Sequence, residues 1–182
     1  MITATAKSPS TRPVEAELEA TLAWLKRRGT KANREGMARY AIRAEKVFGV
    51  SVTTLRQRAK TLGRNHELAS ALWDTGWYEA RMLAAFVDDP ACVTPAQLDR
   101  WCKDFDNWAI CDTACFHLFD RTPHAFKKVA AWSRRKDEFD KRAASAASPD
   151  KTARWIGKDA VRQLGSPAVA RRLAARAAKE KA

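Results

Sequence analysis

Residues 104–116 read DFDNWAICDTACF and place an acid among aromatic residues. A helix that begins near Asn107 puts Trp108 and Asp112 on one face, because side chains four residues apart are neighbours on a helix. The same face continues through Cys115, Phe116 and Phe119. An unpaired carboxylate within such a stripe costs on the order of several kcal/mol. Asp112 therefore needs either a partner or a function.

Helical periodicity extends along the whole chain, and no convincing strand pattern interrupts it. Residues 95–105, for example, place apolar side chains at the i, i+3, i+4 and i+7 positions of an amphipathic helix. We expect further helices at 13–28, 33–44, 52–62, 66–75, 77–87, 107–119, from Thr122-Pro123 onward, at 136–147, 151–164 and 167–182. The chain is therefore predicted to be all-α.

Three of these helices share one predicted start, a capping hydroxyl followed by proline at the first helical position. The pairs are Thr94-Pro95, Thr122-Pro123 and Ser166-Pro167. Gln97 follows Thr94 by three residues, which is the spacing of a capping box. Elsewhere, Ser51 or Thr53 and then Asn65 are the expected caps.

The expected helices are short and are joined by tight turns, so they do not suit a four-helix bundle of this length. Stacked antiparallel pairs, forming a HEAT-like α-solenoid with degenerate repeats, are the favoured architecture. An irregular globular helical domain is the alternative. We expect a disordered lead at 1–12, the helical domain at 13–165 and a basic C-terminal helix at 166–182.

The chain carries 34 Lys and Arg against 21 Asp and Glu, which gives a net charge of +13. This excess favours a polyanionic partner, either nucleic acid or an anionic membrane surface, although a protein can also be basic without such a partner. No apolar run approaches the roughly 20 residues of a membrane span. The first twelve residues lack the apolar core of a secretory signal. We therefore expect a cytoplasmic protein without membrane association.

The four cysteines do not form a CxxC pattern, and nothing in their spacing suggests an oxidising compartment. Cys111 and Cys115 lie one helical turn apart with His117 nearby. No Cys or His pair at the usual zinc spacings completes a metal site around them. Buried helix cysteines are the better interpretation, and we expect no metal and no cofactor.

Residues in a characteristic order extend along most of the chain. They are Gly36–Tyr40, Phe48–Ser51, Leu55-Arg56, Ala59-Lys60, Leu72-Trp73, Glu79–Arg81, Leu98–Trp101, Asp106–Trp108 and Asp112. This order resembles the AlkD-like DNA alkylation repair family over approximately residues 33–165. The resemblance rests on many ordered positions and not on one short motif.

The resemblance implies HEAT-like repeats whose concave, basic surface holds duplex DNA. Enzymes of the family hydrolyse the N-glycosidic bond of cationic alkylpurines, such as N3-methyladenine and N7-methylguanine, without flipping the base into a pocket. Trp108 and Asp112 match the family's pair beside the sugar of the lesion, which makes them the candidate catalytic residues. Arg142 and Arg162 match two arginines that contact DNA. The implied partner is duplex DNA with alkylated bases, and we expect a monomer.

These residue types suit the chemistry. A cationic purine is already a good leaving group, so the charge that needs stabilisation develops on the sugar. A carboxylate such as Asp112 can stabilise that charge and orient water. The indole of Trp108 can pack on the sugar and favour a developing cation. Arg142 can hold a phosphate and also keep Asp112 ionised.

The sequence departs from the family pattern in its C-terminal part. Where the family has a second active-site Trp, three residues before Arg162, this chain has Asp159. Trp155 lies one helical turn earlier and is the candidate replacement at the DNA surface. The segment between Arg142 and Arg162 is also shorter than in the family by about one helix. A non-catalytic HEAT-like protein that binds damaged or branched DNA is therefore the alternative function, and a scaffold for an acidic protein is a third.

Overall fold

The computed structural model describes residues 14–40, 42, 44–134 and 138–146, and within them it contains helices and turns but no strand. The α-helices are α1 (Val14–Arg28), α2 (Lys31–Ala38), α3 (Val52–Leu62), α4 (His66–Asp74), α5 (Tyr78–Val87), α6 (Pro95–Lys103), α7 (Trp108–His117), α8 (Ala125–Trp132) and α9 (Glu138–Ala146). A short 3-10 helix, η1 (Phe119–Arg121), follows α7. The all-α prediction is confirmed for these residues.

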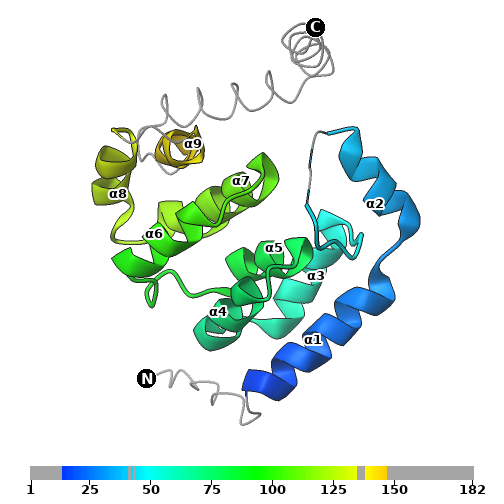
Figure 1. Cartoon of the computed structure of the whole chain (residues 1–182). Coiled ribbons are helices and arrows are strands. Elements are labelled where there is room, and N and C mark those ends of the chain that lie inside the picture. The colour runs from blue at the N-terminus through cyan, green and yellow to red at the C-terminus, as the bar shows by residue number, and fades with distance from the viewer. Residues whose placement is uncertain (1–13, 41, 43, 135–137, 147–182) are drawn as a thin grey trace, which may run out of the picture.

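The helices form two layers (Figure 1). One layer contains α3, α5, α7 and α9, each packed against the next. In the other layer, α1 and α4 cover the α3–α5 side, while α6 and α8 cover α9. From α3 onward each layer follows the order of the chain, whereas α1 packs on α4 and α2 lies at the edge of the molecule (Figure 1). This repeated stacking of helices is the solenoid architecture that the sequence predicts.

Aromatic side chains connect the helix pairs through the core. Trp73 of α4 stacks on Trp101 of α6 with ring centroids 3.9 Å apart and planes 2° from parallel. Phe119 of η1 lies 6.4 Å from Trp101 and 5.8 Å from Trp132 of α8. All four rings are fully buried. These contacts explain why the chain places tryptophans, which bury large areas, at the joints between successive helix pairs.

A buried carboxylate fixes the loop that leads into α3. Glu79, in the first turn of α5, is fully buried. Its two oxygens accept the backbone N–H groups of Phe48, Gly49 and Val50 at 2.9, 2.6 and 3.1 Å. Gly49 adopts φ +87°, and a Cβ there would lie 2.3 Å from the carbonyl oxygen of Thr30. The Glu79 carboxylate and a glycine with positive φ together determine how the first helices meet α5.

Several predicted helix starts are confirmed. Ser51, Asn65 and Thr94 each accept the backbone N–H three residues ahead, at 3.2, 3.0 and 3.2 Å. Pro95 occupies the first turn of α6. Gln97, expected to complete a capping box, instead donates its side-chain amide to Asp88 at 2.7 Å. The Gln97 side chain therefore bonds to Asp88 of another segment and not to the backbone of Thr94, as a capping box would require.

Two helix predictions are wrong. The helix expected over 33–44 begins at Lys31, with Thr30 as its cap, and ends at Ala38. The chain beyond it turns towards α5, where the carbonyl of Lys46 accepts the N–H of Tyr78 at 2.9 Å. Thr122 does not cap α8, because its hydroxyl donates to the carbonyl of Phe119 at 2.9 Å and α8 begins only at Ala125.

The expected lead at 1–12 and the helices expected at 151–164 and 167–182 lie outside the described residues. Among the residues that are described, no helix combines the length and apolar character that crossing a bilayer requires.

Candidate functional site

Helix α7 presents the predicted Trp–Asp pair. Asn107 caps it by accepting the N–H of Ile110 at 3.1 Å, so the predicted start of this helix is confirmed. Trp108 then lies in the first turn, half-buried, and Asp112 follows one turn later with 8% of its surface exposed. The spacing of four residues therefore places the indole and the carboxylate on the same face.

Arg142 of α9 reaches this face and binds Asp112 with two parallel hydrogen bonds. Its Nε donates to Oδ1 at 2.7 Å and its Nη2 donates to Oδ2 at 3.0 Å. The side chains of Arg142 and Asp112 are only 16% and 11% exposed. The guanidinium carbon lies 5.9 Å from the centre of the Trp108 ring, within cation–π range. Three of the five predicted site residues are thus in one cluster.

Cysteine thiols from the neighbouring helices help to position α9. Cys102 of α6 donates to Asp140 at 3.0 Å. On α7, Cys111 approaches the carbonyl of Phe139 and Cys115 that of Ala143, each at 3.9 Å. All three cysteines are buried, as predicted for Cys111 and Cys115. Burial raises the pKa of the Cys115 thiol, which favours the neutral form that packs between helices.

The charge state of Asp112 results from opposing effects. Burial raises the pKa of its carboxyl above the ordinary value of 3.8. The hydrogen bonds and the positive charge of Arg142 lower it again and offset part of that rise. Arg142 is therefore the group that favours the anionic form of Asp112 in this buried position.

Unused hydrogen-bonding capacity remains in the pair. A guanidinium has five N–H donors. Two of the five on Arg142 donate to Asp112. Each carboxylate oxygen of Asp112 accepts one of these bonds and keeps a second acceptor position. The pair can therefore bind an anionic oxygen through Arg142 and orient a water through Asp112 without separating.

Tyr40 completes the cluster, and it was not among the predicted site residues. Its backbone carbonyl accepts the indole N–H of Trp108 at 3.1 Å. Its own side chain is 61% exposed, the largest exposure of any large apolar side chain among the described residues. In the sequence, only the family resemblance pointed to this residue, because the segment Gly36–Tyr40 is part of it. No helical spacing links Tyr40 to α7, because the two are 68 positions apart.

Trp155 and Arg162, the other two predicted DNA-binding residues, lie outside the described residues, as does Asp159. Their assignment stays a prediction. In the described part of the chain, no group of three or more His, Cys, Asp or Glu side chains is arranged to hold a metal ion.

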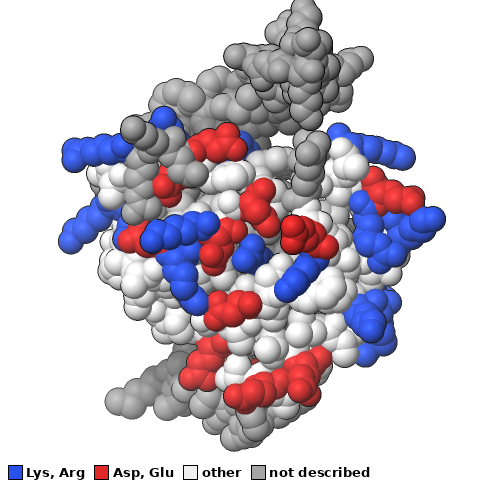
Figure 2. Space-filling view, viewed as in Figure 1, with Lys and Arg blue, Asp and Glu red and all other residues white. Residues whose placement is uncertain are grey.

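The expected concave basic face also stays a prediction. Figure 2 shows acidic and basic side chains interspersed on the face in view. The charge of the chain is unevenly distributed, because residues 147–182 alone contain nine Lys and Arg against three Asp and Glu. Nearly half of the surplus positive charge is thus carried by sequence beyond α9.

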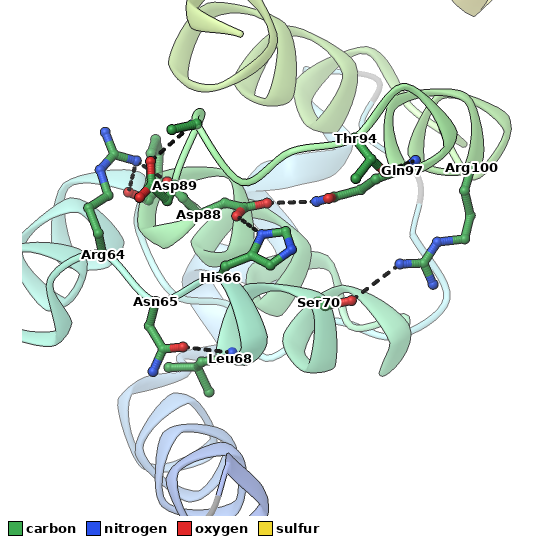
Figure 3. Close-up of polar contacts among 12 residues, drawn as sticks. Arg64, Asn65, His66, Leu68, Ser70, Asp88, Asp89, Thr94, Gln97 and Arg100 are labelled. Atoms are coloured by element: carbon green, nitrogen blue, oxygen red, sulfur yellow. Dashed lines mark hydrogen bonds and ion pairs between the residues drawn. The ribbon is translucent and has the colours of Figure 1, made fainter. Parts of the chain in front are cut away.

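A second polar cluster lies where α4, α5 and α6 meet (Figure 3). Asp88, fully buried at the end of α5, accepts from His66 of α4 and from Gln97 of α6, each at 2.7 Å. Arg64 donates to the backbone carbonyl of Asp88. Burial raises the pKa of Asp88, and the bonds from His66 and Gln97 partly offset this rise. Since both carboxylate oxygens join helices, we interpret this cluster as structural.

Comparison with known proteins identifies the class of fold. One solved structure aligns with a TM-score of 0.65 and 23% sequence identity over 71% of this chain and 55% of its own. It represents "a new family of proteins related to the HEAT-like repeat DNA glycosylases with affinity for branched DNA structures". The likeness confirms the HEAT-like helical fold, and the chain spans about half the length of that relative.

The family follows from the sequence itself. The family model of DNA alkylation repair enzymes matches residues 21–166, most of the chain. The chain therefore belongs to the DNA alkylation repair enzyme family, which confirms the resemblance seen in the sequence. No curated protein matches this chain.

Proposed function

We propose that this protein binds alkylated duplex DNA and hydrolyses the N-glycosidic bond of cationic alkylpurines such as N3-methyladenine and N7-methylguanine. The observation that carries the proposal is the Asp112–Arg142 pair beside Trp108, in a chain of the DNA alkylation repair family. We further propose that the base is not flipped into a pocket, as the family resemblance implies, and the position of the cluster on the face of α7 supports this.

In the proposed reaction, water attacks C1′ of the lesion's deoxyribose, and one proton of that water is released to solvent as its oxygen bonds to C1′. The electrons of the glycosidic bond pass to the purine, which leaves as a neutral base because it was cationic. Asp112 stabilises the positive charge that develops on the sugar and accepts a hydrogen bond from the attacking water. The free N–H groups of Arg142 bind a neighbouring phosphate, and the Trp108 face packs on the sugar.

Base release from DNA containing N7-methylguanine tests the proposal. The full chain is incubated with the DNA at low salt, and released base is quantified against a protein-free control. Release well above the spontaneous rate supports glycosylase activity. Release at the spontaneous rate by folded protein that binds the DNA would contradict it.

A pair of matched substitutions assigns the chemistry to Asp112. Asp112→Asn keeps the shape but removes the charge, and we expect it to lose about 10²-fold or more of base release while DNA affinity is retained. Glu67→Gln is the control, because it also replaces a carboxylate with an amide, at an exposed acid on α4. Equal losses in the two variants would place the reacting water elsewhere.

Binding of branched DNA without catalysis is the second candidate function. It is favoured by the affinity for branched DNA described for the relative of similar fold, and by Asp159 at the position of the family's second Trp. It predicts tight, salt-sensitive binding of four-way junctions with no release of alkylated bases. Stronger binding of linear alkylated duplex than of junctions would count against it.

A further inference from the structure

A second cationic site lies away from the Asp112 cluster, at the end of the layer where α3, α5 and α7 terminate. A cleft of about 430 Å³ opens there. Its walls include Arg56, Lys60, Arg64, Phe86, His117 and Arg121. None of the residues that line this cleft, all of them within the described ranges, is acidic.

Two of the arginines give the cleft its shape. Arg56 lies over the ring of Phe86, 5.7 Å from its centre, and its Nη2 is 3.2 Å from Nε2 of His117. Arg64 donates to the backbone carbonyls of Phe86 and Asp88. These contacts tie α3 to the ends of α5 and α7. Substituting either arginine would therefore disturb the packing as well as the charge.

The other two cations are better placed to meet a ligand. Lys60 lies in the last turn of α3 and is exposed. Arg121 of η1 is 53% exposed at its side chain, and its nearest acid is Asp120 at a loose 3.8 Å. The Asp120 side chain is only 15% exposed, but 3.8 Å is too long for a hydrogen bond, so the N–H groups of the exposed Arg121 stay available to an anion.

Cations near the carboxyl end of a helix can have a purely structural role, which is to offset the negative end of the helix dipole. Whether that role accounts for these cations depends on how their charge compares with that of the helix ends. Each of the three helix ends contributes a partial charge of about −0.5. Arg56, Lys60, Arg64 and Arg121 contribute four permanent positive charges at the same cleft. The helix ends and the neighbouring Asp120 carboxylate offset only part of this charge, so the cleft keeps a net positive charge that attracts an anion.

We propose that this cleft binds a phosphodiester of the DNA backbone and forms a second anchor, separate from the Asp112 site. His117 and Asp112 lie on the same helix, five residues apart, which is about 7–8 Å along its axis. Five residues also turn the helix by about 140°, so Asp112 faces α9 whereas His117 faces α3 and α5, and the two anchors would hold DNA on different sides of α7. Contacts of this kind position a duplex without reading its sequence. The inference rests on the DNA-binding part of the proposed function and not on base release.

The test uses undamaged duplex, so that it does not depend on catalysis. Binding of a fluorescent duplex to the full chain is measured by anisotropy at several salt concentrations. Lys60→Gln/Arg121→Gln removes two exposed cations from the cleft. Lys103→Gln/Lys127→Gln removes two exposed cations from α6 and α8 and is the control with the same net charge.

We expect the cleft variant to bind about tenfold more weakly, and its slope of log K against log salt to fall by about 0.9 for each phosphate that it no longer neutralises. The control should keep a slope close to that of the unsubstituted chain. Equal weakening in both variants would overturn the proposal, because it would mean that only net charge matters. Unchanged binding in both would overturn it as well.

The histidine rings give a direct readout of the ligand. The chain has three histidines, and only His117 lies at the cleft. In ring ¹H–¹³C spectra, added duplex or a dinucleotide phosphodiester should shift His117 in the unsubstituted chain and not in the cleft variant. A shift with inorganic phosphate but none with the dinucleotide would contradict the proposal, because the ligand of the cleft would then be free phosphate and not a phosphodiester. If these binding results were obtained but no base were released, the proposed glycosylase activity would be contradicted and the proposed phosphodiester site would still be supported.

Discussion

At the scale of single residues, the function depends on whether Asp112 is ionised. Burial raises the pKa of its carboxyl above 3.8, and Arg142 offsets part of that rise. Base release should therefore fall as the pH drops, with a midpoint above 3.8, because the protonated carboxyl can neither stabilise the sugar cation nor accept from water.

Arg142→Gln tests this balance. Without the guanidinium, the anionic form of Asp112 loses its stabilising charge, so the pKa of Asp112 rises further and the acid limb of base release moves to higher pH. Single-turnover base release across the acidic range measures the shift. Arg100→Gln is the control. It breaks the exposed pair with Asp74 and should leave the pH midpoint of base release unchanged. An unchanged midpoint in Arg142→Gln would mean that Arg142 does not set the ionisation of Asp112.

Glu79 holds the loop between the first helices and α3 in place. Its buried carboxylate accepts three backbone N–H groups, and Glu79→Gln would turn an amide N–H₂ towards at least one of those donors. We expect a loss of about 2 kcal/mol or more in the free energy of unfolding, since a buried donor loses its partner. Urea denaturation measures the loss. Glu67→Gln, an exposed acid on α4, should change stability by less than about 0.5 kcal/mol.

At the scale of helices, the sequence predicts what local chemistry controls. The caps Ser51, Asn65 and Thr94 make the predicted bonds because each interaction spans three residues, and α7 begins at the predicted place with Asn107 as its cap. The position of Asp112 on an aromatic helix face follows from spacing alone. Periodicity of 3.6 residues and capping chemistry are therefore sufficient to predict most of the helices and the Trp108–Asp112 part of the candidate site.

Tertiary contacts decide the rest. The second helix ends at Ala38, and the chain beyond it reaches the start of α5, where the carbonyl of Lys46 accepts the N–H of Tyr78. Gln97 follows its capping threonine in the expected place but bonds to Asp88 on another helix. Tyr40 reaches Trp108 across 68 positions. No local pattern contains such partners, so a single sequence does not predict them.

The stacked indoles of Trp73 and Trp101 join two successive helix pairs. Trp101→Ala would leave a large cavity between α4 and α6, and we expect it to cost about 3–5 kcal/mol of unfolding free energy. Thermal and urea denaturation measure the cost. Tyr40→Ala is the control, because its ring is 61% exposed and its removal should cost little. A cost for Trp101→Ala no larger than that of the control would mean that the aromatic row does not hold the helix pairs together.

At the scale of the whole molecule, two sources of DNA affinity need to be separated. The Asp112 site lies on α7 and α9, and the cationic cleft lies at the ends of α3, α5 and α7. Both therefore belong to the same layer of helices. Residues 147–182 add nine cations, several of them beyond residue 166, where the family match ends. Cations near DNA strengthen binding through counterion release whether or not they contact a lesion. Affinity alone therefore does not report on the site.

Charge removal beyond the family match distinguishes these sources. A variant with glutamine at five cationic positions, Arg171, Arg172, Arg176, Lys179 and Lys181, alters no residue of the Asp112 site or of the cleft. We expect weaker DNA binding and a salt slope that is shallower by about 0.9 for each phosphate left without a cation. The rate of base release at saturating protein should not change, because Asp112 and Arg142 remain in place. Anisotropy and single-turnover assays measure the two quantities. A fall in the saturated rate would show that these cations act on the reacting complex and not only on its formation.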